Sequence, residues 1–123
     1  MAIENIWENR GLFRNFTEKI TATEILSFNL TIQGDARFDT LRYVINDFTH
    51  LSDFVGSEND IEAIAAIDDA ASMSNPYIKV AIISTSESFL AWANFYCTKM
   101  ENTSYDCKIF ANKNDAYDWV NIS

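Results

Sequence analysis

The sequence is poor in the residues on which the common chemical sites depend. Its 123 residues include one histidine, two cysteines, three glycines and one proline. A single histidine excludes a two-histidine zinc site, and Cys97 and Cys107 are too far apart in sequence for a typical metal or redox pair. Gly11, Gly34 and Gly56 are too widely spaced for a phosphate-binding loop or a dinucleotide fingerprint, and no Gly-x-Ser-x-Gly motif occurs. We therefore expect no metal and no cofactor.

Positive charge is also scarce. Nine Lys and Arg stand against eighteen Asp and Glu, which gives a net charge of -9. This charge repels phosphate backbones and anionic lipids, so we expect no nucleic acid partner. The sequence has no run of about 20 apolar residues and begins without a cationic leader followed by an apolar stretch. These absences predict a cytoplasmic protein without membrane insertion, whose cysteines are reduced.

Hydrophobic residues make up 48% of the chain, and nine Phe, three Trp and five Tyr are among them. This content is sufficient for one packed core, and the length is typical of one domain, so we expect a single domain over residues 1–123.

Strand patterns alternate with helix patterns along the chain. A β-hairpin is predicted around Gly11, which would supply a positive φ, and a helix is predicted from the capping box Thr21-Ala-Thr-Glu24 to Gln33. The predicted strands cover residues 2–8, 12–18, 42–48, 77–84 and 107–110, and the later helices follow 59–62, 84–87 and 112–115. The order ββαβαβαβα predicts an α/β fold with a mixed sheet whose later strands are parallel.

The second predicted helix carries apolar residues at helical spacing. We expect one side to face the sheet and a polar side to face solvent. The expected inner residues are Ala63, Ile64, Ile67, Ala70 and Ala71, and the expected outer residues are Glu62, Asp68 and Asp69.

The segments GLFRNFTEKITATEIL, GDARFDTLRYVINDF, IAAIDDAASMSNPYIKVAIIST and CKIFANKNDAYDWV resemble the bacterial SpoIIAA-like family, within the STAS and CRAL-TRIO-like group of folds. The resemblance implies that fold and a non-enzymatic regulator or small-ligand binder. STAS anti-sigma-factor antagonists carry a phosphorylated hydroxyl in an Asp-Ser-Ser/Thr-Gly motif. The matching segment here, DFTHLSDFVGSEND, lacks that motif, so no hydroxyl inherits the phosphosite by motif. Phosphorylation of Ser52 or Ser57 is a further expectation that rests only on their position after the predicted strand 42–48.

The segment 47–60 is predicted to be a polar loop at the carboxyl end of a strand, where ligands bind in α/β sheets. Its candidate ligand or partner residues are Asp47, His50, Ser52, Asp53 and Ser57. A solvated loop with helix-capping residues explains the same composition. A remote alternative is an enzyme with His50 as general base, oriented by Asp47 or Asp53.

Asn29 lies between apolar residues on the first predicted helix. With Phe28 and Ile32 it is a candidate for a pocket between helix and sheet, where its amide would orient a ligand. A structural hydrogen bond is the other interpretation of a buried amide.

The third predicted helix directs Phe89, Leu90, Ala93, Tyr96, Cys97 and Met100 inward at helical spacing. Phe95 is then left on the opposite side. With Trp92 and Lys99 it forms a candidate interface for a homodimer or a protein partner. Cys97 and Cys107 are interpreted as packing residues with protonated thiols.

The sequence thus favours a non-catalytic regulatory or protein-interaction module of STAS-like type that forms a homodimer. The alternative is a carrier or sensor of a small apolar molecule, and the remote alternative is an enzyme.

Overall fold

The computed structural model of the protein describes residues 3–121. It confirms the predicted order ββαβαβαβα and adds a short 3-10 helix before the third strand. Residue 2 of the predicted first strand lies outside the described part. The elements are β1 (Ile3–Glu8), β2 (Gly11–Thr21), α1 (Ala22–Gln33), η1 (Ala36–Thr40), β3 (Tyr43–Val55), α2 (Glu58–Ser74), β4 (Lys79–Ile83), α3 (Glu87–Met100), β5 (Asp106–Phe110) and α4 (Lys113–Val120).

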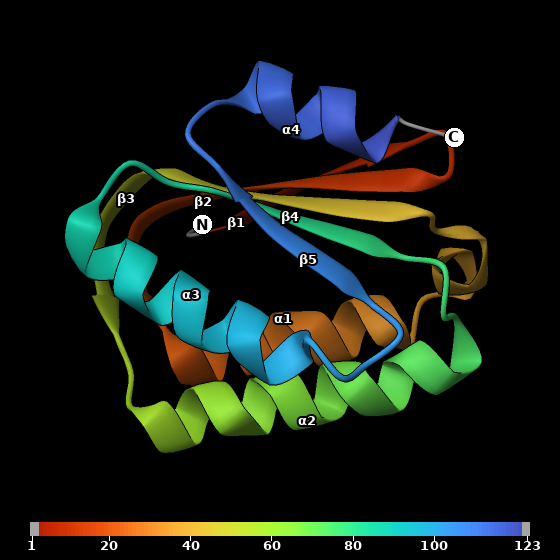
Figure 1. Cartoon of the computed structure of the whole chain (residues 1–123), viewed down its shortest axis with the longest axis horizontal. Coiled ribbons are helices and arrows are strands. Elements are labelled where there is room, and N and C mark those ends of the chain that lie inside the picture. The colour runs from red at the N-terminus through yellow and green to blue at the C-terminus, as the bar shows by residue number, and fades with distance from the viewer. Residues whose placement is uncertain (1–2, 122–123) are drawn as a thin grey trace.

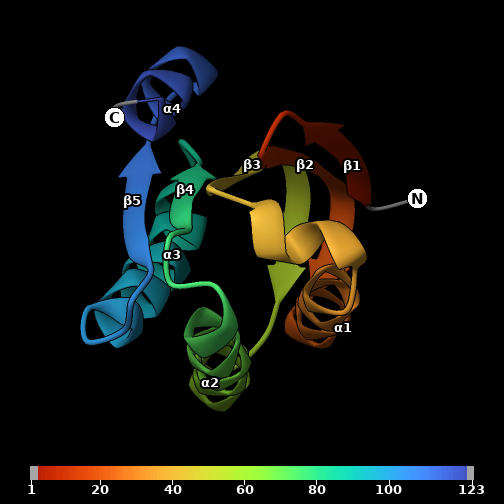
Figure 2. The same cartoon turned by 90° about the vertical axis from the view of Figure 1, so that its right-hand side faces the viewer.

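The five strands form one mixed sheet in the order β1-β2-β3-β4-β5. β1 and β2 are antiparallel, and β2 to β5 run parallel to one another. Crossovers between parallel strands have one hand, and the three crossovers here all advance the sheet in the same direction. Helices α1, α2 and α3 therefore lie on one face of the sheet, and α4 alone packs on the other (Figures 1 and 2).

The two faces of the sheet have separate hydrophobic clusters. On the side of α1 to α3, a large cluster includes Leu12, Phe16, Val44, Phe48 and Val80. On the side of α4, a smaller cluster includes Phe13, Tyr43, Ile45, Ala81 and Val120. Successive strand residues alternate between the two clusters, as the pleat of a strand requires. No helix in the described part is long and apolar enough to cross a bilayer.

β3 is longer than predicted. It continues to Val55, so most of the predicted 47–60 loop is a strand. β4 ends opposite Asp47, and beyond that point β3 pairs only with β2. Two register shifts interrupt this outer ladder, and Glu18 at the second shift has a φ of 61°. The outer part of β3 has one free edge, which explains its polar, loop-like sequence.

Helix α1 begins at the predicted capping box, in which Thr21 and Glu24 exchange hydrogen bonds. Helix α2 begins earlier than predicted, because its N-cap is Ser57 and not Asn59. The Ser57 hydroxyl accepts a bond from the Asp60 amide, and the Asp60 carboxylate accepts one from the Ser57 amide. Aspartate thus completes a capping box usually completed by glutamate or glutamine.

The hairpin turn between β1 and β2 departs from the prediction. Arg10, and not Gly11, has the positive φ, at 59°, and no described glycine has a positive φ. Gly11 is required for a different reason. A Cβ on Gly11 would lie 2.0 Å from Cζ of the Tyr43 ring. Tyr43 is buried, and its hydroxyl donates a hydrogen bond of 2.5 Å to the Glu8 carboxylate.

Gly11→Ala is expected to lower the free energy of unfolding by about 2 kcal/mol, because the Tyr43 ring must move out of a packed site. Gly34→Ala is the matched control, because a Cβ there would lie no closer than 3.6 Å to the nearest neighbouring atom. Chemical denaturation of both variants measures the effect. Equal stability of the two variants would contradict the assigned role of Gly11.

Candidate functional site

A cavity of about 100 Å³ lies between the sheet and the layer of helices α1 to α3. Strands β2, β3 and β4 form its floor, and η1 and Tyr105 contribute to its sides. Most of the side chains around it are apolar, including Ile25, Ile32, Phe38, Phe48, Ile64, Ile82, Phe89 and Trp92. Polar side chains from both layers also reach it, namely Arg14, Asn29, Gln33, Asn46, Asp68, Tyr96 and Tyr105. The cavity is therefore apolar with a defined polar part.

The carboxyl group of Asp68 is the centre of the polar part. Asp68 is 6% exposed, although it lies on α2, far from either end of the helix. Its Oδ2 accepts a hydrogen bond of 2.5 Å from the Tyr96 hydroxyl of α3, and its Oδ1 accepts one of 2.8 Å from the Gln33 amide of α1. The Asn29 amide nitrogen of α1 lies 3.3 Å from both oxygens. One carboxyl group thus connects three helices.

Burial dominates the electrostatics of this cluster. Desolvation raises the pKa of Asp68, and the hydrogen bond from Tyr96 and the charge of Arg14 oppose this rise. Burial and the nearby Asp68 carboxylate raise the pKa of Tyr96 and of Tyr105, so both phenols are neutral.

Arg14 brings a cation into the floor of the cavity. It lies in the middle of β2, is 5% exposed, and donates from Nε to the Oδ1 of Asn46 on β3 at 2.7 Å. Desolvation lowers the pKa of the guanidinium to about 10, which leaves it charged at neutral pH. Neither described ion pair, Arg37 with Asp35 nor Lys99 with Glu62, involves Arg14.

Three polar atoms around the cavity are buried without a hydrogen-bond partner among the described residues. They are Nη1 of Arg14, Oδ1 of Asn29 and the hydroxyl of Tyr105. Buried polar atoms are almost always paired, and an unpaired one costs about 1 to 3 kcal/mol. Three such atoms at one cavity leave hydrogen-bonding capacity for a water molecule or another group from outside the chain.

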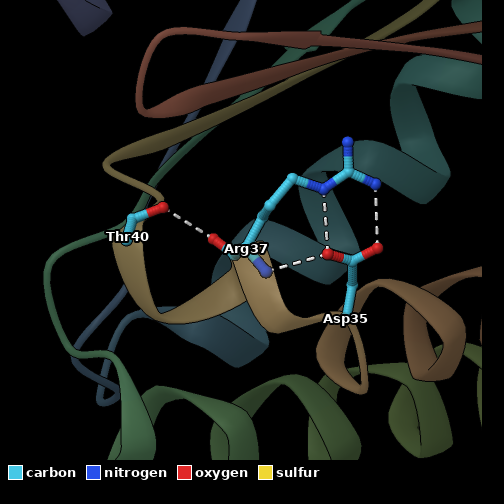
Figure 3. Close-up of polar contacts among 3 residues, drawn as sticks. All are labelled: Asp35, Arg37 and Thr40. Atoms are coloured by element: carbon cyan, nitrogen blue, oxygen red, sulfur yellow. Dashed lines mark hydrogen bonds and ion pairs between the residues drawn. The ribbon is translucent and has the colours of Figure 1, made fainter.

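A surface cluster fixes η1, which carries Phe38 to the cavity. Asp35 caps η1 by accepting the Arg37 amide, and both its oxygens accept from the Arg37 guanidinium at 3.0 and 2.9 Å (Figure 3). The Thr40 hydroxyl donates to the Arg37 carbonyl oxygen (Figure 3). The hydrogen bonds from the Arg37 side chain and amide lower the pKa of Asp35 to about 2. The Arg37 guanidinium also lies 3.7 Å from the centre of the Trp7 ring.

The residues predicted for a pocket lie near this cavity. Asn29 and Ile32 line it. Phe28 does not, and instead packs half-buried against the main hydrophobic cluster. The Asn29 amide nitrogen makes the predicted structural hydrogen bond, to Asp68, whereas its oxygen has no partner among the described residues and its role toward a ligand stays a prediction.

The candidate residues of the 47–60 segment are spread along β3 and do not line the cavity. Asp47 is 7% exposed, faces the side of α4, and accepts hydrogen bonds from the Thr49 amide and hydroxyl. His50, Ser52 and Asp53 are exposed on the outer part of β3, and Ser57 caps α2. Among residues 3–121, no hydrogen bond joins the side chains of Asp47, His50 and Asp53, which occupy separate positions along β3.

The predicted faces of α2 were wrong in one important respect. Asp68 is buried and Ala63 and Ala70 are exposed. The buried residues are Ile61, Ile64, Ala65, Asp68 and Ser72. Their spacing is that of one helix face. The burial of Asp68 was therefore predictable from its position on the same face as Ile61, Ile64 and Ala65, although its charge favours an exposed position.

The predicted outward position of Phe95 was also wrong. Trp92 and Phe95 both pack half-buried against the main hydrophobic cluster, and the Trp92 ring lies 5.7 Å from that of Phe54. Lys99 is occupied within the chain as well, because it pairs with Glu62 at 3.1 Å and lies 5.3 Å from the Phe95 ring. The side chains that suggested an interface thus have intramolecular contacts, and homodimerisation stays a prediction.

The two cysteines are neighbours in space, which their separation in sequence concealed. Cys97 lies on α3 and Cys107 on β5, and both are half-buried free thiols. A hydrogen bond between them lowers the pKa of Cys97, and the same bond together with burial raises the pKa of Cys107.

The element order and the five-stranded mixed sheet define a SpoIIAA-like α/β fold, as the sequence predicted. No protein-family model and no curated protein sequence matches the chain. Among solved structures, the chain is similar to an uncharacterised protein of the DUF3478 family with a SpoIIAA-like fold from Shewanella loihica PV-4. The two are 19% identical with a TM-score of 0.52, over 97% of this chain and 92% of the other. At this identity the similarity establishes the fold.

The raised pKa of Asp68 predicts a pH dependence of stability. The folded protein holds this proton to a higher pH than the unfolded chain, whose Asp has a pKa of 3.8. The free energy of unfolding of the wild type should therefore fall, relative to that of Asp68→Asn, as the pH rises from about 4 through the raised pKa.

Urea denaturation of the two proteins across this pH range tests the prediction. Asp69→Asn, which removes the same charge from the neighbouring position, serves as the control. If the stability advantage of the wild type over Asp68→Asn grows with pH, the carboxyl group is not disfavoured by burial as the structure indicates.

Proposed function

We propose that the chain is a non-catalytic carrier or sensor that binds a small, mainly apolar molecule between its helix layer and its sheet. The observation that carries this proposal is the cavity of about 100 Å³, with unpaired polar atoms of Arg14, Asn29 and Tyr105 at its walls.

The size of the cavity supports a small ligand. Protein interiors are packed to the density of organic crystals, and few voids exceed the size of a water molecule. An apolar cavity of about 150 Å³ binds benzene. A cavity of about 100 Å³ favours a molecule no larger than benzene over a nucleotide or a long lipid chain.

The position of the cavity supports a sensor as well as a carrier. Its walls come from all three helices of one layer, and those helices are joined through Asp68. A molecule that contacts α1, α2 and α3 at once would have a different affinity for each arrangement of these helices. A bound molecule would therefore change the helix surface that a protein partner contacts. This effect is compatible with the regulatory role predicted from the sequence.

Other assignments have weaker support. The aromatic side chains that favoured a protein-interaction module, Trp92 and Phe95, contact the core of the same chain. The residues that an enzyme would use, Asp47, His50 and Asp53, are dispersed along β3 and lie outside the cavity.

Benzene tests whether the cavity binds a small apolar molecule. At five times its dissociation constant, benzene is expected to stabilise the wild type by about 1 kcal/mol, or roughly 4 °C in melting temperature. Ala93 is 3% exposed and lines the cavity, so Ala93→Leu should fill part of the space and abolish this shift.

Ala91→Leu, at an exposed position of the same helix, adds the same atoms outside the cavity and should keep the shift. Thermal unfolding with and without benzene measures all three proteins, and amide NMR spectra verify that each is folded. Absence of a shift in the wild type, or an unchanged shift in Ala93→Leu, would refute the proposed binding site.

A further inference from the structure

Arg14 has hydrogen-bonding capacity that the described residues do not use. A guanidinium carries five N–H donors and no acceptor. Nε is bonded to Asn46, whereas Nη1 is buried without a partner among residues 3–121. An arginine that is 5% exposed cannot direct this donor to bulk solvent. The free donor is therefore available to a group inside the cavity that Arg14 lines.

Asp68 is the nearby anion, but it does not fill this role. Its charge acts on Arg14, yet the two side chains are not among the ion pairs of the described chain. Both Asp68 oxygens already accept hydrogen bonds from Asn29, and each accepts another, from Gln33 or from Tyr96. The cluster balances Asp68 with neutral donors and leaves Arg14 without a direct anionic partner.

We infer that the cavity takes a short-chain monocarboxylic acid whose carboxylate is held by Arg14 and whose alkyl chain lies against the apolar walls. This inference rests on the proposed function and names the chemical class of its ligand. A carboxylate is the acceptor whose planar shape fits a guanidinium, and charge-assisted bonds between them are about twice as strong as neutral ones. Nη1 supplies one donor, and the unpaired Tyr105 hydroxyl supplies another at the wall of the cavity.

The remaining walls set the length of the acid. Ile25, Ile32, Phe38 and Ile64 have no polar side-chain atoms, so they form the surface against which the alkyl chain lies. The volume fits about four carbons, because butanoate has as many non-hydrogen atoms as benzene. A phosphate ester would place a larger and more highly charged group beside one cation, which leaves most of its charge uncompensated.

Butanoate and butanamide form a matched pair of probes, because they share shape and chain length and differ in charge. We expect wild-type protein to bind butanoate at least 10-fold more tightly than butanamide, as measured by amide NMR titration. Arg14→Gln should lose most of this preference while it still binds butanamide. Lys19→Gln removes one positive charge from an exposed position of the same strand and should keep the preference.

The possible results separate this inference from the proposed function. If butanoate and butanamide bind equally to the wild type, or if Arg14→Gln keeps the preference, the carboxylate assignment is overturned while a benzene shift still supports the apolar site. If butanoate, butanamide and benzene all fail to bind the wild type, both proposals fall. Should Arg14→Gln not fold, the Arg14 side-chain N–H signals of the wild type decide the matter. They should shift with butanoate and not with butanamide, and unmoved signals would refute the assignment.

Discussion

The buried carboxyl group of Asp68 is the constraint on which the helix layer depends. A carboxyl group in an apolar interior must be supplied with donors, and these come from Asn29 and Gln33 on α1 and from Tyr96 on α3. α2 lies between these two helices, so satisfaction of one side chain fixes the relative positions of all three (Figure 2). Apolar packing alone would tolerate sliding of the helices, whereas these bonds specify one arrangement.

The same constraint explains why a cavity persists beneath the helices. The Asp68 carboxyl group and its donors join the three helices on one side of the cavity. Arg14 and Asn46 lie on the surface of the sheet at the other side. Aliphatic and aromatic residues surround these groups without filling the space between them. On the opposite face of the sheet, α4 packs over Phe13, Tyr43 and Ala81 in a separate cluster. The two faces thus differ in packing, and the proposed ligand site lies on the face with three helices.

Much of the fold was predictable because capping boxes, strand composition and element order all act locally. The outer part of β3 was missed because a strand with one free edge has a polar sequence that resembles a loop. Asp68 was predicted to be exposed because it is charged, although it lies on the same helix face as Ile61, Ile64 and Ala65. Its burial depends on hydrogen-bond donors from two other helices, which the local sequence does not show. The buried position of Asn29 was predictable because a lone amide lies among apolar residues on its helix. Phe95 was misplaced because its contacts come from segments distant in sequence.

The proposed function requires that the space between the helix layer and the sheet admits a small apolar molecule. A crystal pressurised with xenon tests it most directly, since xenon enters apolar cavities without regard to the chemistry of the natural ligand. A xenon site is expected between α1, α2, α3 and the sheet, near Ile25, Ala93 and Phe89. Side chains packed against one another in that region, with no xenon bound there, would contradict it.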